Sequence, residues 1–246
     1  MHTLIKRALL IRGHHGSVFV RITKSMSDSA NPSLEELRWD YHANTLRRKD
    51  LAADPLHQFK KWFADALAAE IREPNAMTLS TIGLDGYPTA RTVLMKDYTD
   101  DGVTFFTNYE SRKGRELEAN PVASVLFFWK DLERQALIRG KIKRLAAEES
   151  TRYFQSRPYA SRIGAWASKQ SEEIPNRGWL DERVEKFETE FPDSGSEESV
   201  PRPKFWGGYL LVPEFVEFWQ GQPGRKHDRF EYSKDEGEWS ARRLSP

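Results

Sequence analysis

The chain contains no cysteine among its 246 residues. This absence excludes disulfide bonds, thiolate nucleophiles, Cys-x-x-Cys redox chemistry and cysteine-ligated zinc, so any redox reaction must depend on a bound cofactor. We predict no metal site. No apolar run reaches the roughly 18 residues that span a bilayer, and a net charge of +1 gives no overall field that would recruit nucleic acid or an anionic membrane. Neither is expected as a partner.

Acidic residues are missing from the first 27 positions, which carry five Lys or Arg. Such a composition suits a mitochondrial presequence, and it suits equally well an upstream extension of a chain that starts at Met26. We therefore expect residues 1–33 to be a disordered N-terminal extension and residues 34–246 to form the folded domain. The expected location is the cytoplasm, or the mitochondrion if residues 1–25 are a genuine presequence.

Standard catalytic motifs are also missing. The sequence has no HExxH, no GxSxG, no Walker A motif and no GxGxxG after a strand. The absence of these motifs argues against the hypotheses that the protein is a hydrolase or a Rossmann dehydrogenase.

The apolar residues that are present follow two periods. Asp54 and Pro55 form a helix start, and one apolar face follows at helical spacing: Leu56, Phe59, Phe63, Leu67 and Ile71. Five β-branched or aromatic runs then occur within about 70 residues, divided by Asp-Gly turns: AMTLSTI, PTARTVLMKDY, VTFFTN, VASVLFFWK and RQALIRGKIKRL. Such runs predict antiparallel hairpins of a barrel or sandwich.

Helices alternate with the remaining strands. Four segments predict helices, the first with Ser111 as its N-cap: SRKGRELEAN, AAEESTRYFQSRP, PYASRIGAWAS and GWLDERVEKFETEF. Three later runs predict strands: GGYLLVPEFVEFWQ, HDRFEYS and EWSARRL. We therefore predict a single mainly β domain, an antiparallel barrel with helices packed on it.

Two segments are suited to binding anions. SRKGRE begins a helix, so unpaired backbone N–H groups coincide with Arg112 and Lys113. Tyr153 and Arg157 lie four residues apart in a predicted helix, with Ser161 beyond Pro158, and all three side chains can donate to a phosphate. Each segment could also be an ordinary solvated surface. Together they suggest two phosphorylated ligands, such as a cofactor and a substrate.

Several motifs occur in a specific order: RTVLMK, TFFTN followed by SRKGRE, LERQ, RYFQSRP, IGAWASKQS, FWGGY and FWQG…RKHDRF. In this order they resemble the pyridoxamine 5′-phosphate oxidase family, FMN enzymes that make pyridoxal 5′-phosphate. The resemblance runs from about Arg38 to the C-terminus. It implies an FMN-binding split β-barrel, antiparallel and Greek-key-like, with a C-terminal dimerisation region. The implied homodimer would hold FMN in two clefts at the subunit interface.

The resemblance implies two sets of binding residues. Those expected to contact FMN are Arg91, Thr92, Val93, Leu94, Met95, Lys96, Phe106, Thr107, Arg112, Lys113, Gln135, Gln170, Ser171, Trp206 and Arg229. Those expected to contact substrate are Arg38, Tyr41, Lys96, Tyr153, Arg157, Ser161, Arg225 and His227, with Arg225 and His227 at the reacting end. Phe106 departs from the Tyr that is usual in the family, and RWDY departs from RREY.

The implied reaction is the oxidation of pyridoxamine 5′-phosphate and pyridoxine 5′-phosphate by oxygen, in vitamin B6 metabolism. Its products are pyridoxal 5′-phosphate, hydrogen peroxide and, from the amine, ammonia. His227 could be a base or only a positioning group, since its pKa is ordinarily near neutrality. Two alternatives stay open: another split-barrel flavin oxidoreductase with a different substrate, and a noncatalytic carrier of flavin or pyridoxal phosphate.

Overall fold

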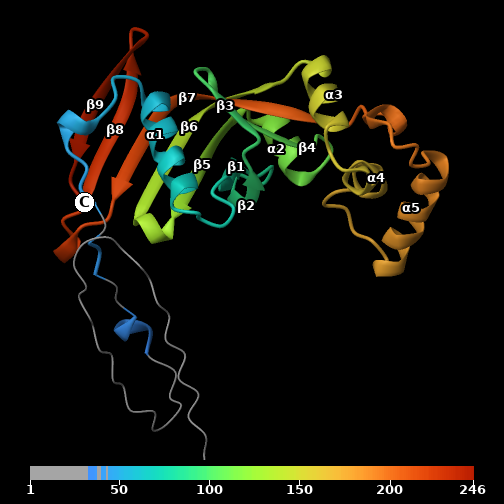
Figure 1. Ribbon diagram of the computed structural model, residues 1–246, viewed down its shortest axis with the longest axis horizontal. Coiled ribbons are helices and arrows are strands. Elements are labelled where there is room, and N and C mark those ends of the chain that lie inside the picture. The colour runs from blue at the N-terminus through green and yellow to red at the C-terminus, as the bar shows by residue number, and fades with distance from the viewer. Residues whose placement is uncertain (1–32, 38–39, 43) are drawn as a thin grey trace, which may run out of the picture. The chain divides into compact units, whose positions relative to one another are not determined.

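The computed structural model describes residues 33–37, 40–42 and 44–246 of the chain (Figure 1). The chain divides into two units, Met1–Trp39 and Asp40–Pro246. In the first unit the described residues include one 3-10 turn, Leu34–Glu36. The predicted extension over residues 1–33, apart from its last residue, lies outside the described residues, and so does Arg38.

Nine antiparallel strands form one sheet in the second unit. Along the main path they lie in the order β2-β1-β5-β6-β7-β4-β3, while β8 pairs with β7 and β9. The strands are β1 (Ala76–Ile82), β2 (Pro88–Leu94), β3 (Asp97–Thr99), β4 (Gly102–Asn108), β5 (Val122–Trp129), β6 (Arg134–Arg144), β7 (Trp206–Gln220), β8 (Asp228–Asp235) and β9 (Glu238–Leu244). The predicted antiparallel, mainly β architecture is confirmed.

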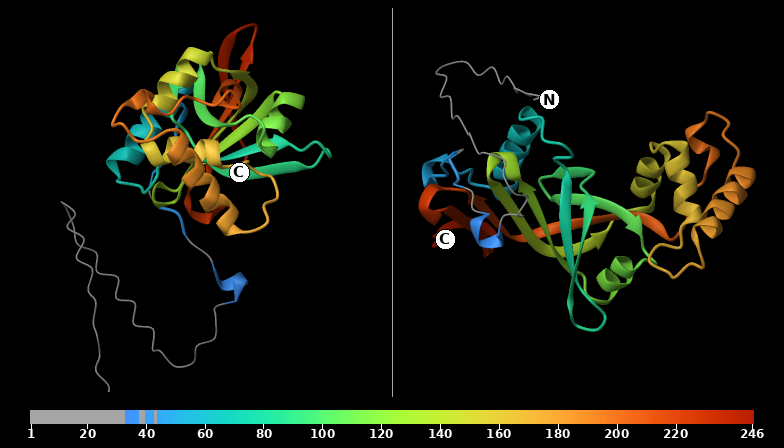
Figure 2. Two further views of the ribbon diagram at one scale, coloured as in Figure 1. Left: turned by 90° about the vertical axis from the view of Figure 1, so that its right-hand side faces the viewer. Right: turned by 90° about the horizontal axis from the view of Figure 1, so that it is seen from below.

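Strand β7 connects the two ends of this sheet. It is 15 residues long and pairs with β6 along nearly its whole length. Its first half also pairs with β4, and its second half pairs with β8. Figure 2 shows β7 running the length of the sheet while the β1–β2 hairpin projects from it.

The predicted strand PTARTVLMKDY is divided in the structure, because the chain changes partner near its middle. Strand β2 pairs with β1, and β3 pairs with β4. At the break, the N–H of Met95 donates to the carbonyl of Asn75 and the N–H of Lys96 donates to the carbonyl of Thr104. Lys96 therefore lies just beyond a strand end.

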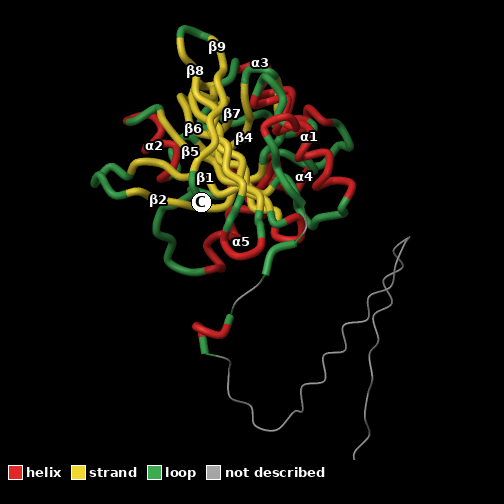
Figure 3. The backbone as a smooth tube through the Cα atoms, turned by 90° about the vertical axis from the view of Figure 1, so that its left-hand side faces the viewer, coloured by secondary structure: helices red, strands yellow, loops and turns green. Residues whose placement is uncertain are grey.

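The described residues form five α-helices: α1 (Pro55–Ala68), α2 (Arg112–Ala119), α3 (Ala147–Gln155), α4 (Tyr159–Ala167) and α5 (Arg177–Glu190). Of these, α3, α4 and α5 lie together at one end of the sheet (Figure 1). Figure 3 shows α1 and α2 on opposite sides of the strands. As predicted, the side chain of Asp54 caps α1, accepting from the N–H groups of Leu56 and His57, and Ser111 caps α2. No helix among the described residues is long and apolar enough to cross a membrane.

Two hydrophobic cores hold these elements together. The main core packs α1 against the strands through buried residues such as Phe59, Phe63, Phe127, Ile138 and Phe218. The second core joins α3, α4 and α5 to the start of β7 through Phe154, Ile163, Phe187, Val200 and Trp206. The start of β7 is thus fixed by helices, and its end is fixed by β6 and β8.

The predicted apolar face of α1 is partly wrong. Leu67 was expected to face the core, but its side chain is 55% exposed. Successive steps of four residues drift around a helix by about 40° each, so the buried stripe passes instead through Phe59, Trp62, Phe63 and Ala66. Ile71 lies beyond the helix end.

Two substitutions in α1 should separate core from surface. Phe59→Ala removes a fully buried ring and should lower the free energy of unfolding by about 3–5 kcal/mol. Leu67→Ala should change it by less than about 0.5 kcal/mol, because the side chain is exposed. Urea denaturation of both variants at equal protein concentration measures the difference, and comparable losses would contradict the observed face of α1.

Candidate active site

The N-terminus of α2 is held by a buried serine. The hydroxyl of Ser111 donates to the carbonyl of Asn108 (2.7 Å) and accepts from the N–H of Gly114 (3.3 Å). A Cβ on Gly114 would lie 2.0 Å from the carbonyl oxygen of Tyr109, so only glycine lets the helix start so close to the end of β4. The first helical residue, Arg112, is exposed. The arrangement suits an anion at the positive end of the helix.

Lys113 lies in a polar cluster beside this helix start. Its ammonium donates to the side-chain oxygen of Gln170 (2.9 Å) and to the hydroxyl of Thr107 (3.3 Å). Thr107 in turn donates to Gln170 (3.0 Å). Burial, and then the charge of Arg91, lower the pKa of Lys113. A bound anion would favour the charged form of Lys113, so these residues fit a phosphate group.

Arg91 is fixed by a buried carboxylate. Its guanidinium donates to Glu116 (2.7 Å) and also to the hydroxyls of Thr81 and Thr89. Glu116 is 2% exposed. Burial raises its pKa, but the hydrogen bonds from Thr81, Thr89 and Arg91 outweigh this and leave the pKa lowered. Glu116 therefore stays ionised and sets the direction of the Arg91 side chain.

The other residues predicted from RTVLMK are exposed to different degrees. Strand β2 ends the main path of the sheet, so the backbone of residues 92–94 has one edge that no strand pairs with among the described residues. Such an edge can offer backbone groups to a ligand. Met95, by contrast, is buried in the main core at 3% exposure.

A cluster of aromatic rings lies next to the Lys113 cluster. The rings of Phe106 and Tyr153 are stacked with centroids 4.0 Å apart, and Phe106 and Trp206 are 5.4 Å apart. The guanidinium carbon of Arg157 lies 4.7 Å from the centroid of Trp206. The sequence predicts that Arg157 lies in the same helix as Tyr153, but α3 ends at Gln155 and Arg157 lies beyond it. The Arg157 guanidinium and the Tyr153 ring both pack against the Trp206 ring instead.

Arg157 carries a hydrogen-bond donor without a partner. Its Nη1 is buried and bonded to no described atom. Burial is also the main cause that lowers its pKa. The side chain lines a cavity of about 290 Å³ together with Asn108, Ser161, Gly164, Ala165, Ser168, Gln170 and Trp206. Burying an unpaired guanidinium N–H is costly, so an acceptor from a ligand would be strongly stabilised here.

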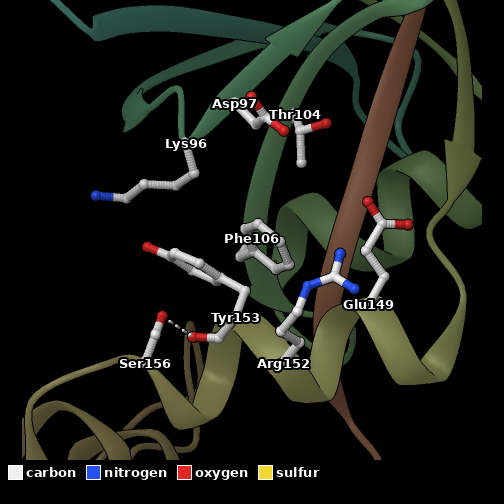
Figure 4. Close-up of a pocket in the computed structure, with 8 residues that line it drawn as sticks. All are labelled: Lys96, Asp97, Thr104, Phe106, Glu149, Arg152, Tyr153 and Ser156. Carbon is white, nitrogen blue, oxygen red and sulfur yellow. Dashed lines mark hydrogen bonds between the residues drawn. The ribbon is translucent and has the colours of Figure 1, made fainter.

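A second cavity, of about 220 Å³, shares Phe106 and Tyr153 with the aromatic cluster (Figure 4). The ammonium of Lys96 and the hydroxyl of Tyr153 point to the same side, whereas Arg152 and Glu149 lie on the other. Burial raises the pKa of the Tyr153 phenol, which therefore remains a hydrogen-bond donor near neutral pH. Lys96 and Tyr153 thus add two donors to those of Arg157 and Ser161.

A separate group of predicted residues lies at the far end of β7. Gln135 of β6, Trp219 of β7 and Arg229 of β8 are direct cross-strand partners. The ring of Trp219 lies 4.7 Å from that of His227 and 5.5 Å from that of Tyr41, measured between centroids. Trp219 was not among the site residues predicted from the sequence. Its motif, FWQG, was visible, but only the strand register shows that it lies between Gln135 and Arg229.

The turn that precedes β8 fixes the tautomer of the neutral His227 side chain. The N–H of Gln222 donates to Nδ1 of His227 (3.1 Å), so the neutral imidazole carries its proton on Nε2. Burial, followed by the charge of Arg225, lowers the His227 pKa. Arg225 itself is exposed with a left-handed backbone (φ 60°). Arg229 pairs with Glu217 at 2.9 and 3.1 Å, and this hydrogen bonding raises its pKa.

The predicted residues therefore form two half-sites. The first comprises Arg91, Thr92, Val93, Leu94, Met95, Lys96, Phe106, Thr107, Arg112, Lys113, Tyr153, Arg157, Ser161, Gln170, Ser171 and Trp206, and the second comprises Tyr41, Gln135, Arg225, His227 and Arg229. Trp206 begins β7 and Trp219 lies near its end, so roughly 40 Å of extended strand separates them. A small ligand bound by Arg157 beside Trp206 could not also touch His227 beside Trp219 in a single chain.

This antiparallel sheet, with helices gathered at one end and an Arg-His turn at the other, is the split β-barrel fold of a class of flavin-binding proteins. Two family models match the chain: pyridoxamine 5′-phosphate oxidase over residues 63–191, and the pyridoxine 5′-phosphate oxidase C-terminal dimerisation region over residues 206–246. The chain belongs to the pyridoxamine 5′-phosphate oxidase family of enzymes.

Similar proteins cover most of the chain. A pyridoxine/pyridoxamine 5′-phosphate oxidase from Cupriavidus pinatubonensis is 50% identical over 214 residues, covering 87% of this chain and 99% of that protein. One from Thermosynechococcus vestitus is 50% identical over 213 residues, with the same coverage of 87% and 99%. The crystal structure of PhzG from Burkholderia lata has a TM-score of 0.76 at 31% identity, covering 83% of this chain and 99% of that one. An FMN-binding protein from Nostoc punctiforme, with a TM-score of 0.61 at 18% identity, shares the fold.

The titration of His227 tests the electrostatics of the second half-site. Its pKa should lie below the ordinary value of 6.5. Arg225→Ala removes one of the two causes and should raise the pKa toward that value, because a neighbouring cation no longer opposes protonation. NMR titration of the imidazole measures the change, with Lys226→Ala as the control in the same turn. An unchanged His227 pKa in Arg225→Ala would contradict the arrangement.

Proposed function

We propose that the protein oxidises pyridoxamine 5′-phosphate and pyridoxine 5′-phosphate to pyridoxal 5′-phosphate, with FMN as cofactor and oxygen as final oxidant. Hydrogen peroxide would be released, and ammonia as well from the amine. The observation that carries the proposal is the buried, unpartnered Nη1 of Arg157, a residue that lines a cavity together with Ser161. A substrate phosphate supplies the missing acceptor. The relatives that are about 50% identical over 87% of this chain support the same activity.

FMN fits the polar groups of the first half-site. Its phosphate would be held at the start of α2 by Arg112 and Lys113, with Thr107 and Gln170 beside them. Arg91, whose charge is matched by Glu116, lies near Lys113. When bound, the flavin supplies the acceptor for the hydride that leaves the C4′ carbon of the substrate. The absence of cysteine is consistent with a reaction in which no thiol takes part.

The substrate would be held from both ends. Arg157, Ser161, Tyr153 and Lys96 donate hydrogen bonds to its phosphate, and Arg225 and His227 contact the pyridine ring near C4′. Because the N–H of Gln222 occupies Nδ1, the neutral His227 presents Nε2–H and donates a hydrogen bond. This geometry favours His227 as a positioning group over a general base. Protonation of Nδ1 would set two N–H groups against each other and disturb the turn.

Two copies of the chain would be needed for one ligand to touch both Arg157 and His227, since these residues lie beside opposite ends of β7. The first half-site of one protomer would face the second half-site of its partner. Phe128, 53% exposed, is the cross-strand neighbour of Gln135 and so shares a sheet face with Trp219 and Arg229. This face is suited to meet the second copy. The match to the family's C-terminal dimerisation region supports a homodimer.

A related oxidase of another substrate is the second candidate. The PhzG structure, 31% identical, contains tetrahydrophenazine-1-carboxylic acid. A carboxylate could also accept from Arg157, but it offers fewer acceptor oxygens than a phosphate to a site with donors from Arg157, Ser161, Tyr153 and Lys96. A noncatalytic carrier would bind the same ligands without turnover.

Adding pyridoxamine 5′-phosphate to the purified yellow protein should produce pyridoxal 5′-phosphate and hydrogen peroxide in equal amounts. Mass analysis after denaturation should identify FMN. Pyridoxamine without its phosphate is the matched control substrate, and it should react far more slowly because Arg157 then has no acceptor. Binding without peroxide would indicate a carrier. Equal rates with and without the phosphate, or bound FAD, would contradict the proposal.

Mixing two impaired variants, assayed at a substrate concentration far below the KM of each, should test the shared site. Arg157→Ala should mainly raise KM, by the loss of hydrogen bonds worth about 1.5–3 kcal/mol each, and Arg225→Ala should also lower kcat, because C4′ is then misplaced. In a mixed dimer one site carries both changes and the other carries neither. Refolding the variants together should therefore restore about a quarter of the wild-type activity. No gain over the separate variants would place both half-sites in one chain.

A further inference from the structure

Residues 41–42 and 44–46, here called the strap, are bound along their backbone by side chains from three other segments. The N–H of His42 donates to the carboxylate of Glu133 (2.8 Å), between β5 and β6. The N–H of Leu46 donates to Asp228 at the start of β8 (3.0 Å). The carbonyl of Asn44 accepts a hydrogen bond from the side-chain amide of Gln222. Side chains thus bind the backbone of every second residue of the strap: His42, Asn44 and Leu46.

The strap brings the ring of Tyr41 to the second half-site. That ring lies edge-on to His227 and to Trp219, with 5.5 Å between centroids in both cases. A Cβ on Gly221 would lie 2.7 Å from Cγ of Tyr41, so glycine is required for this contact. At the other end of the strap, Leu46 is 3% exposed and belongs to the main core. The strap is therefore tied to the core at one end and covers His227 at the other.

Gln222 connects the strap directly with His227. Its backbone N–H donates to Nδ1 of His227, and its side chain donates to the carbonyl of Asn44. One residue thus sets both the imidazole tautomer and the path of the strap. Asp228 is also the next residue after His227, and it pairs with Arg243 of β9 at 2.7 Å. A displacement of the strap would consequently shift the turn that carries Arg225 and His227.

We propose that Glu133, Gln222 and Asp228 are positioning residues, which bind the strap backbone and so hold Tyr41 against His227. They need not touch substrate or cofactor. Tyr41 excludes water from one side of the imidazole, which contributes to the burial that lowers its pKa. The groups that face His227 are Arg225 from its own turn, Tyr41 from the strap, and the uncharged Trp219 and Gln222. The inference rests on the proposed oxidase function.

A double-mutant cycle distinguishes positioning from general stabilisation. Gln222→Ala keeps the backbone N–H that binds His227 and removes only the bond to the strap. It should lower kcat/KM for pyridoxamine 5′-phosphate by about 3- to 10-fold, as expected for one hydrogen bond. Asp228→Ala should do the same as a second variant. In a Tyr41→Ala background neither change should lower kcat/KM further, because the residue they position is gone. Additive losses would overturn the proposal.

Two further readouts do not depend on the size of the rate. The acid limb of the kcat/KM pH profile should move to higher pH in Gln222→Ala and in Tyr41→Ala, because a more exposed His227 protonates more readily. Lys226→Ala, in the same turn, should leave the profile unchanged. An acid limb that stays in place in Gln222→Ala would overturn the proposal.

Hydrogen exchange of the wild-type holoenzyme and its variants separates this inference from the proposed function. The amides of His42 and Leu46 should exchange slowly in the wild type, and faster in Gln222→Ala and Asp228→Ala with flavin content unchanged. Unaltered exchange would show that these side chains do not hold the strap. If instead exchange responds but the wild type does not oxidise pyridoxamine 5′-phosphate, the oxidase proposal fails and the anchoring of the strap stands.

Discussion

The division of β7 between two sets of partners is the constraint on which the rest of the structure depends. Its first half pairs with β4 and its second half with β8, while β6 runs beside both. The backbone hydrogen bonds of a 15-residue strand cannot be satisfied by one short neighbour, so the two ends belong to different surroundings. Trp206 consequently packs among helices, and Trp219 lies in the sheet face beside His227. The separation of the half-sites follows from this pairing.

The two half-sites differ in how many of their positively charged side chains are paired with a carboxylate. In the first, Arg91 is matched by the buried Glu116, whereas Lys113 is surrounded by neutral acceptors and Arg157 keeps an unpaired donor. Excess positive charge is therefore left for a ligand. In the second, Arg229 is neutralised by Glu217, and Arg225 and Lys226 are exposed beside His227. The first half-site is suited to phosphate groups, and the second is suited to orient a ring.

Features that depend on interactions within one short segment could be predicted from the sequence. The cap at Ser111 and the limits of β1, for example, follow from side-chain type and spacing. The break in β2 at Met95 was not predictable, since it depends on which strands lie on either side. Trp219 was missed for the same reason: its neighbours Gln135 and Arg229 are 84 and 10 residues away along the chain, and register alone joins them. Leu67 shows that helical spacing predicts a face only within a turn or two.

The turn at Arg225 depends on contacts that are remote in sequence. Gly224 and Arg225 both have left-handed backbones, which is unfavourable for the arginine. Within the turn, the N–H of Gln222 donates to His227 and the N–H of Lys226 donates to the carbonyl of Pro223. From outside, Gln222 binds Asn44 and Asp228 binds both Leu46 and Arg243, so the strap and β9 add support to this backbone shape. A strained conformation maintained from outside can place Arg225 and His227 in a fixed geometry before substrate arrives, which lowers the entropy cost of the reactive arrangement.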